Sequence, residues 1–328
     1  MTLHISEAEV RAVLTMPLAI EAVEQISRRQ ASGEVVVHPR RRFELPGGGF
    51  FHYMAAADFA TGYVAMKQYT FVKGKLRFLV PLYEMSSGEL LALIEADYMG
   101  QLRTGAASGV ATKYLARKNA STAAIVGAGG QARTQLEAVA EVRKLETARV
   151  YSRDPNKREK FSKEMSKRLG IAVKPAASSS EAVRNADIVC TATTTVNPVV
   201  NGADLAPSVH INAIGANHAH KRELDNEAVE SADVIVVDSI EQSRQEAGDL
   251  ILVFGEDELC WKGVKKLSDV VAGKTAGRTS DAEVTLFKSN GIASWDLAAA
   301  MKTYALAKER GLGRELPLWR DAAKARER

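Results

Sequence analysis

The stretch STAAIVGAGG QARTQLEAVA EVRKLETARV YSRD occupies residues 121–154 and decides the fold of the chain. The apolar run at 123–126 predicts a buried parallel strand, and the apolar spacing after the glycines predicts a helix. A second short strand is expected at 148–151. Strand, glycine-rich turn, helix and strand within about thirty residues are the context of a dinucleotide-binding βαβ unit. We therefore predict a Rossmann domain around this stretch.

The glycine-rich turn, Gly127-Ala-Gly-Gly-Gln-Ala132, matches the G-x-G-x-x-A pattern of dinucleotide-binding turns. Gly127 permits the tight turn, Gly129 lets the backbone approach a pyrophosphate, and Ala132 lets the helix pack closely on the strand. The N–H groups at the start of the helix would then face the phosphates. Because strands flank the turn on both sides, dinucleotide binding is favoured over a purely structural turn.

Ser152-Arg153-Asp154 follow the second predicted strand, at the place where the ribose of the cofactor is usually recognised. A carboxylate at the first position would bind the ribose 2′-hydroxyl of NAD, but a serine stands there. Arg153 is available to pair with a 2′-phosphate or stack beside it. Asp154 could instead cap the helix that begins at Pro155. We therefore predict that NADP(H) is preferred over NAD(H).

Length and composition allow two domains with sizeable cores, since the chain has 328 residues of which 46% are hydrophobic. The net charge of +4 is spread along the sequence and does not suggest a nucleic-acid partner. No apolar run is long enough to span a membrane, and the N-terminus does not resemble a signal peptide. Cys190 and Cys260 lack metal-like spacing. These features predict a soluble cytoplasmic protein with no metal, membrane or nucleic-acid partner.

The first third of the chain has a different texture from residues 121–154. Six β-type runs between residues 35 and 95 are separated by breaks that contain glycine, which favours a mostly antiparallel sheet or an open barrel over a βαβ array. A helix rich in small residues is expected at 98–116, and the domain boundary at Lys118-Asn119. Beyond the boundary, helices and strands alternate up to a last strand at 284–288, and a long helix is expected at 294–311.

The predicted fold class is therefore α/β. A Rossmann NAD(P)-binding domain is expected at 118–301. An α+β substrate-binding and dimerisation domain is expected at 1–117, joined by a C-terminal helix at 302–328. The basic tail at 320–328 is expected to be the solvated end of that helix.

Lys67 and Arg103 are the first candidates for chemistry. Lys67 lies inside an otherwise apolar strand, and a buried lysine is costly unless it is paired, while burial would bring its pKa toward the range of proton transfer. The pattern equally allows an edge-strand lysine in water. Arg103 opens a helix of small residues, where it could bind a carboxylate through two hydrogen bonds or simply lie at the surface.

The loop at 215–222 follows a predicted Rossmann strand, so it lies at the carboxyl edge where ligands bind. It carries His218 and His220, which are two residues apart and have no third metal ligand nearby in sequence. We therefore expect no metal site here. Either histidine could be a general acid, and both could equally be solvated.

Seven short motifs, taken together in their order and spacing, make the chain similar to the ornithine cyclodeaminase/μ-crystallin family over nearly its whole length. They are Met66-Lys67-Gln-Tyr, Gln101-Leu-Arg103-Thr104-Gly-Ala-Ala, Ile125-Val-Gly-Ala-Gly-Gly-Gln-Ala132, Ile211-Asn-Ala-Ile-Gly215-Ala, Arg222-Glu-Leu-Asp225, Glu246-Ala-Gly-Asp249 and Thr285-Leu-Phe-Lys-Ser-Asn-Gly291-Ile-Ala.

The resemblance implies a homodimer whose N-terminal domain binds a small amino or imino acid. By the same resemblance Lys67 is the active-site lysine and Arg103 holds the substrate carboxylate. Arg41, flanked by Arg40 and Arg42, is a second substrate arginine. The predicted cofactor-binding residues are Thr104, Gly127, Gly129, Gly130, Gln131, Ala132, Ser152, Arg153, Thr193 and Gly291.

Asn217 departs from the pattern of true ornithine cyclodeaminases, which resemble one another in carrying an aspartate in this loop. An asparagine cannot accept a proton as a base. The resemblance then favours an NAD(P)H-dependent oxidoreductase that reduces a small cyclic ketimine carboxylate such as Δ1-pyrroline-2-carboxylate, or that reversibly deaminates a small L-amino acid such as alanine. Two alternatives stay open: a cyclodeaminase-type lyase that uses bound NAD, and a non-catalytic NADPH-binding protein.

Overall fold

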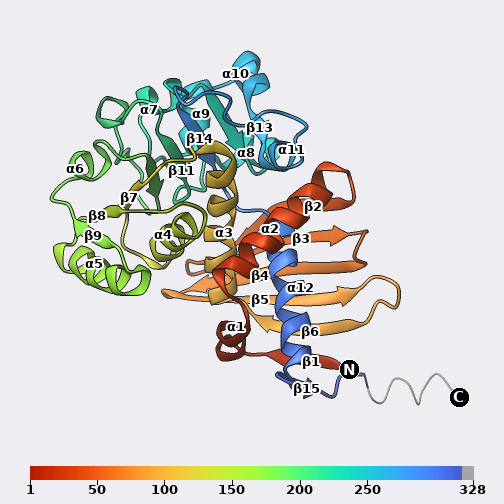
Figure 1. Ribbon diagram of the computed structural model, residues 1–328. Coiled ribbons are helices and arrows are strands. Elements are labelled where there is room, and N and C mark those ends of the chain that lie inside the picture. The colour runs from red at the N-terminus through yellow and green to blue at the C-terminus, as the bar shows by residue number, and fades with distance from the viewer. Residues whose placement is uncertain (320–328) are drawn as a thin grey trace, which may run out of the picture. The chain divides into compact units, whose positions relative to one another are not determined.

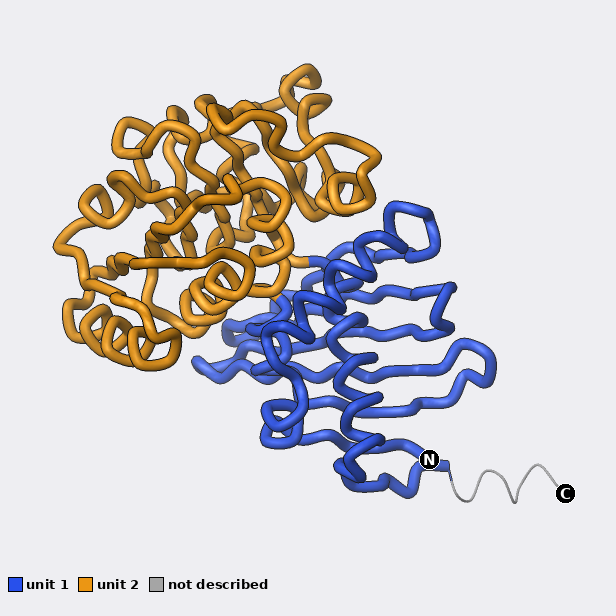
Figure 2. Tube along the Cα trace, in the orientation of Figure 1, with its two compact units in different colours: residues 1–103, 292–328 blue, residues 104–291 orange. Residues whose placement is uncertain are grey.

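The computed structural model describes residues 1–319 (Figure 1), which form two compact units (Figure 2). Unit 1 comprises Met1–Arg103 and the chain from Ile292 onward, and unit 2 comprises Thr104–Gly291. These bounds differ from the predicted division after residues 117 and 301. The observed boundary after Arg103 lies inside a helix, because α3 (Asp97–Leu115) runs through it without a break. The observed boundary after Gly291 lies just before α12 (Ala293–Glu309), and the whole of that helix belongs to unit 1.

Unit 1 contains a seven-stranded sheet in the order β15-β1-β6-β5-β4-β3-β2, in which only β1 and β6 pair in parallel. The predicted antiparallel sheet is therefore present, although the two short strands β1 and β15 were not predicted. The strands are β1 (Thr2–Ile5), β2 (Val35–Glu44), β3 (Phe50–Asp58), β4 (Tyr63–Val72), β5 (Lys75–Glu84), β6 (Leu90–Glu95) and β15 (Arg314–Leu316).

Helices α2 (Met16–Ala31) and α12 pack together and lie on the sheet of unit 1, where α12 contacts β2, β3, β4 and β5 (Figure 1). A short helix, α1 (Glu7–Val13), precedes them, and Ser6 and Glu9 form the capping box that the sequence indicates. Within the described residues, the helix predicted at 302–328 ends at Glu309, so the prediction is wrong for 310–319, where Gly311 and Gly313 adopt positive φ and lead into β15. Residues 320–328 lie outside the described part of the chain.

Strict alternation in β3 and β4 decides which side chains of the sheet are buried. His52, Met54 and Ala56 of β3 are buried, and the residues between them are half-exposed. In β4, Lys67 pairs in register with Met54, and it is buried on the same face. Lys67 is therefore an interior residue, and the alternative of an edge-strand lysine in water is excluded.

Unit 2 is a doubly wound domain with an eight-stranded parallel sheet in the order β13-β12-β14-β11-β10-β7-β8-β9, which confirms the predicted α/β class. Its strands are β7 (Thr122–Val126), β8 (Thr147–Tyr151), β9 (Ala172–Pro175), β10 (Ile188–Thr191), β11 (His210–Ala213), β12 (Val234–Val237), β13 (Lys265–Lys266) and β14 (Thr285–Lys288). Besides the second part of α3, its helices are α4 (Gly130–Val142), α5 (Pro155–Leu169), α6 (Ser179–Val183), α7 (Asn226–Glu230), α8 (Ile240–Glu246), α9 (Gly248–Phe254), α10 (Glu258–Gly263) and α11 (Leu267–Val271), with a 3₁₀ turn at Gly202–Asp204.

The first βαβ unit has the local structure that its glycines predict. Gly127 has a φ of +121°, and a Cβ built on it would lie 2.4 Å from the carbonyl oxygen of Ala192, so only glycine fits. Gly129 is the N-cap of α4, and nothing lies within 4 Å of the place its Cβ would occupy. Ala132, in the first turn of α4, is fully buried in the core cluster that also contains Ala123 and Ile125 of β7. No helix within residues 1–319 combines the length and the apolar character needed to cross a membrane.

A buried histidine in the sheet of unit 2 gives folding a measurable pH dependence. His210 lies within hydrogen-bond distance of Thr285 and Asn212, and burial lowers its pKa from 6.5 to about 3. Because the pKa is lower in the folded chain, the unfolded chain binds the proton at a higher pH than the folded one does. The contribution of His210 to the unfolding free energy is therefore fully present above pH 6.5 and is lost as the pH falls toward 3. We expect this residue to reduce the unfolding free energy by about 1.4 kcal/mol per pH unit in that window.

Urea unfolding between pH 7 and 4 would measure this slope in the wild type and in His210→Gln. Carboxylates titrate in both proteins, so the difference between the two slopes isolates His210. Equal slopes would contradict the assignment.

Candidate active site

Three buried charged side chains of unit 1 meet at one point: Lys67 from β4, Arg103 from α3 and Asp296 from α12. The Lys67 Nζ lies 2.8 Å from Asp296 Oδ2, and the Arg103 Nε donates to Asp296 Oδ1 at 2.9 Å. Their exposed fractions are 3%, 5% and 1%. Two basic groups therefore share one carboxylate out of contact with water, and when Lys67 is protonated one positive charge of the cluster has no counterion within it.

The surroundings of Lys67 bring its pKa close to neutrality. The pKa is lowered from 10.5 to about 7, chiefly by burial and also by the positive charges of Arg103 and Arg40, against the opposing effect of the Asp296 carboxylate. A group with a pKa near the working pH transfers protons efficiently in either direction. A buried lysine with such a pKa fits the role of a general acid or base.

Arg103 has a donor that the described residues leave unsatisfied. Its Nη1 is buried and makes no hydrogen bond within residues 1–319, although Nε is bound to Asp296. An unsatisfied buried guanidinium N–H is costly, and a carboxylate ligand would satisfy it through a strong charge-assisted bond. This observation fits a ligand that carries a carboxylate.

Sequence reasoning missed Asp296. The residue lies in a mostly apolar helical segment, Ala293-Ser-Trp-Asp296-Leu-Ala-Ala-Ala, all eight residues of which are buried. An acidic residue in the middle of such a segment is a signal of a buried ion pair. The same signal led to Lys67, and it would have led to Asp296.

Arg41 does not join this cluster. A β-bulge between His38 and Arg41 shifts the register of β2, and Arg41 pairs with Tyr53, whose half-exposed side chain alternates with the buried His52 and Met54. Arg41 itself is exposed, whereas the charge of Arg40 acts on Lys67. The structure therefore favours Arg40 over Arg41 as the second arginine near Lys67.

Unit 2 contains a cavity of about 410 Å³ at the carboxyl ends of β7, β8 and β10. The glycine turn forms one wall, the segment after β8 another, and Ala192 to Thr195 a third. The open space at Gly129 and the N–H groups of α4 provide the cradle that a pyrophosphate requires. These residues fit a dinucleotide such as NAD or NADP.

Five of the predicted cofactor residues line this cavity: Gly127, Gly129, Ser152, Arg153 and Thr193. The other five do not line it. Gly130, Gln131 and Ala132 lie in the first turn of α4, with Ala132 fully buried. Thr104 is buried in α3, and the N–H of Gly291 donates to Asp238 at 2.6 Å. Asp154 caps α5 by accepting hydrogen bonds from the N–H groups of Asn156 and Lys157. That bonding confirms the capping role, and Asp154 also lines the cavity.

Asn217 lies in the loop after β11, as predicted, next to His218. Its Oδ1 is 2.9 Å from His218 Nδ1, and the rings of His218 and His220 are 5.6 Å apart. Within residues 1–319 no group of three or more His, Cys, Asp or Glu side chains is arranged to hold a metal ion.

The comparisons with known proteins agree on one family. The model of the "Ornithine cyclodeaminase/mu-crystallin family" matches residues 2–311. The chain is 38% identical over 245 residues to a Delta(1)-pyrroline-2-carboxylate reductase of Bacillus cereus, covering 74% of this chain and 75% of that one. It is 33% identical over 328 residues to an alanine dehydrogenase of Archaeoglobus fulgidus, covering 97% and 99%.

A solved structure of similar fold is that of Thermococcus litoralis Delta(1)-pyrroline-2-carboxylate reductase in complex with NADH and L-proline. It superposes with a TM-score of 0.92 at 38% identity, covering 96% of this chain and all of that one. An archaeal alanine dehydrogenase dimer with bound NAD superposes with a TM-score of 0.90 at 33% identity, covering 97% and 99%.

Proposed function

Since the chain belongs to the ornithine cyclodeaminase/mu-crystallin family, we propose that it is a nicotinamide-dependent reductase of a small cyclic ketimine carboxylate of the Δ1-pyrroline-2-carboxylate type. The unsatisfied Nη1 of Arg103, beside a lysine with a pKa of about 7, is the observation that carries the proposal. Reversible deamination of a small L-amino acid is the second candidate, favoured by the alanine dehydrogenase that matches 97% of the chain.

The residues of unit 1 divide the chemical work. Arg103 binds the substrate carboxylate and so fixes the neighbouring C=N bond. Lys67 holds the proton that the imine nitrogen takes up, and Asp296 keeps both cations in place. The reduced nicotinamide supplies hydride equivalents when it is bound. Hydride on the imine carbon and a proton on nitrogen together turn the imine into a secondary amine.

Asn217 argues against a cyclodeaminase. Elimination of ammonia from ornithine needs a base for the amine chemistry, and the amide of Asn217, placed beside His218, cannot take up a proton. Net oxidation of the cofactor separates a reductase from such a lyase, which would leave the cofactor unchanged overall. The alternative of a non-catalytic NADPH-binding protein predicts tight cofactor binding without turnover.

We further propose that NADP(H) is preferred, on the strength of Arg153 and Lys157, which both line the cavity beyond Ser152. Replacing Arg153 with alanine would raise the KM for NADPH by about tenfold and leave the KM for NADH nearly unchanged, because only NADPH carries the 2′-phosphate. Lys160→Ala is the matched control, since Lys160 is exposed on α5 and does not line the cavity. An equal rise in both KM values would contradict this preference.

We also propose a homodimer formed through the face of the unit 1 sheet that carries Tyr53, Val64 and Met66. These residues are half-exposed, while their neighbours along β3 and β4 are buried on the other face. A half-exposed apolar sheet face of this kind fits a second copy of the chain. Sedimentation of the wild type would give the dimer mass, and Met66→Asp would shift it toward the monomer.

A panel of substrates tests the reaction class. Oxidation of NADPH and NADH would be followed by absorbance with Δ1-pyrroline-2-carboxylate, Δ1-piperideine-2-carboxylate and pyruvate plus ammonia, and ornithine would be assayed for proline and ammonia. The proposal expects the cyclic imines to give the highest kcat/KM. Faster turnover of pyruvate with ammonia would favour the amino-acid dehydrogenase instead.

A further inference from the structure

Three fully buried charged residues of unit 2 have no part in the chemistry described above: Glu223, Asp249 and Lys288. Glu223 lies in the loop between β11 and α7, Asp249 in the first turn of α9, and Lys288 ends β14. Charges are buried at considerable cost unless they are paired and hydrogen-bonded. Each of these three is bonded to backbone at the carboxyl edge of the Rossmann sheet.

The Glu223 carboxylate joins the chain after β10 to the chain after β11. Its Oε2 accepts from Thr191 Oγ1 at 2.7 Å and from the N–H of Gly215 at 2.6 Å. Its Oε1 accepts from both the N–H and the hydroxyl of Thr193 at 2.7 Å. Four donors occupy the acceptor sites of a single carboxylate. Gly215 has no room for a side chain, because its Cβ would lie 2.3 Å from the Thr193 carbonyl oxygen.

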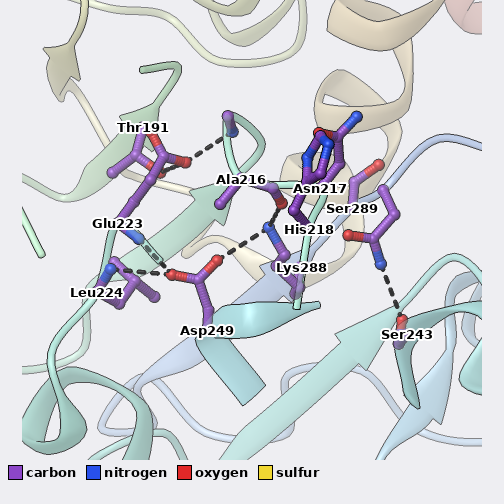
Figure 3. A network of polar contacts seen from close by, with 12 residues as sticks. Thr191, Ala216, Asn217, His218, Glu223, Leu224, Ser243, Asp249, Lys288 and Ser289 are labelled. Atoms are coloured by element: carbon purple, nitrogen blue, oxygen red, sulfur yellow. Dashed lines mark hydrogen bonds and ion pairs between the residues drawn. The ribbon is translucent and has the colours of Figure 1, made fainter. Parts of the chain in front are cut away.

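The Lys288–Asp249 ion pair extends the network to β14 (Figure 3). Lys288 Nζ lies 2.9 Å from Asp249 Oδ2 and donates to the carbonyl of Ala216 at 2.5 Å. Asp249 Oδ1 in turn accepts from the N–H groups of Glu223 and Leu224 at 2.6 and 2.9 Å. The pair therefore holds both Glu223 itself and the residue that precedes Asn217.

The order of the strands explains why this network extends to the wall of the cofactor cavity. Strands β14, β11, β10 and β7 are adjacent, and the network binds the chain that follows β10 and β11. Thr193 lines the cofactor cavity. Its neighbour Ala192 packs against Gly127 of the glycine turn after β7. A change at Glu223 would therefore reach the cavity wall although Glu223 does not line it.

We propose that Glu223 and the Lys288–Asp249 pair are positioning residues, which hold Thr193 and the segment 215–217 in the places that the bound nicotinamide dinucleotide requires. The inference rests on the proposed function only in needing a dinucleotide in the cavity. It assigns no proton transfer to the three charges. Their effect on turnover passes through the backbone that they hold.

Glu223→Gln tests the proposal with Asp187→Asn as its matched control. Asp187 precedes β10, at the end of that strand opposite to the one that Glu223 contacts. Its carboxylate accepts from the N–H groups of Ser121 and Thr122 and from the Thr122 hydroxyl. Both substitutions replace a multiply bonded carboxylate by an amide. The Kd for NADPH would be measured by nucleotide fluorescence, together with Tm.

We expect Glu223→Gln to raise the Kd for NADPH by roughly tenfold or more, since small misplacements at such sites have large effects. Asp187→Asn would lower Tm without changing the Kd. If both variants kept the wild-type Kd, the network would be structural only and the proposal would be wrong. The Kd needs no substrate, so a wild type that binds NADPH without reducing any imine would contradict the proposed function while leaving this test readable.

Thr191→Val provides a second, milder test in case Glu223→Gln does not fold. The substitution removes one donor to Glu223, and Thr191 is buried and does not line the cavity. We expect the Kd for NADPH to rise severalfold in this variant and the effect of Thr193→Val to shrink in its presence, because both act through Glu223. Independent effects of the two substitutions would overturn the proposal.

Discussion

Replacing Lys67 with methionine will lower the kcat of imine reduction by about 10²- to 10⁴-fold, which is the usual contribution of a positioned general acid. The methionine keeps much of the buried volume, and Asp296 keeps its bond to Arg103. The cluster thus loses its proton donor and retains its carboxylate-binding arginine. The Kd for NADPH will stay at the wild-type value, because the cofactor cavity belongs to unit 2.

Lys302→Met is the control for this prediction. Lys302 lies on α12, the helix that carries Asp296, but it is solvent-accessible and pairs with Glu21. Its kcat and Tm should match those of the wild type, since surface ion pairs contribute little. Full turnover by Lys67→Met, with Tm unchanged, would remove Lys67 from the mechanism.

Arg103→Gln will lower kcat/KM for the ketimine carboxylate by about 10²- to 10³-fold, mainly by raising KM. The buried Nη1 that we assign to the substrate carboxylate is lost, and a charged group paired in a buried site typically costs about 2–5 kcal/mol when truncated. Steady-state kinetics over a wide range of substrate concentrations would separate KM from kcat. A fall in kcat with KM unchanged would mean that Arg103 does not bind the carboxylate.

The pH profile of the reduction links these residues. Lys67 must be protonated to donate, so kcat/KM in the wild type will be constant at low pH and will fall above pH of about 7. The positive charge of Arg103 lowers the pKa of Lys67 and the charge of Asp296 raises it. The falling limb will therefore move to higher pH in Arg103→Gln and to lower pH in Asp296→Asn. If the falling limb stayed at the same pH in both variants, it would report the titration of a group other than Lys67.

The parts of the fold that sequence could predict are those that depend on local pattern. The glycine turn at 127–132 requires backbone geometry that few other residues allow, and the strand before it, β7, is a short and mostly buried apolar run. The position of Lys67 inside an apolar strand singled it out, but the pattern allowed both a buried lysine and an edge-strand lysine in water, and only β4 decides for the buried one. Local patterns of this kind can be recognised in the sequence without knowledge of the tertiary structure.

The rest depended on contacts between distant segments. Asp296 reaches Lys67 across 229 residues of sequence, and no local pattern pairs the two. The choice between Arg40 and Arg41 turned on a β-bulge, which moves side chains to the other face of a strand. The role of Glu223 was equally hidden, because its carboxylate bonds to hydroxyl and N–H groups at the ends of two separate strands, β10 and β11.

The most direct test of imine reduction uses NADPH that carries deuterium at the transferred position of the nicotinamide, with Δ1-pyrroline-2-carboxylate as substrate. Mass spectrometry and NMR of the product would locate the label. Our account predicts proline with one deuterium on the α-carbon for each cofactor oxidised. Proline formed from ornithine with no oxidation of the cofactor, and no labelled proline from the imine, would contradict it.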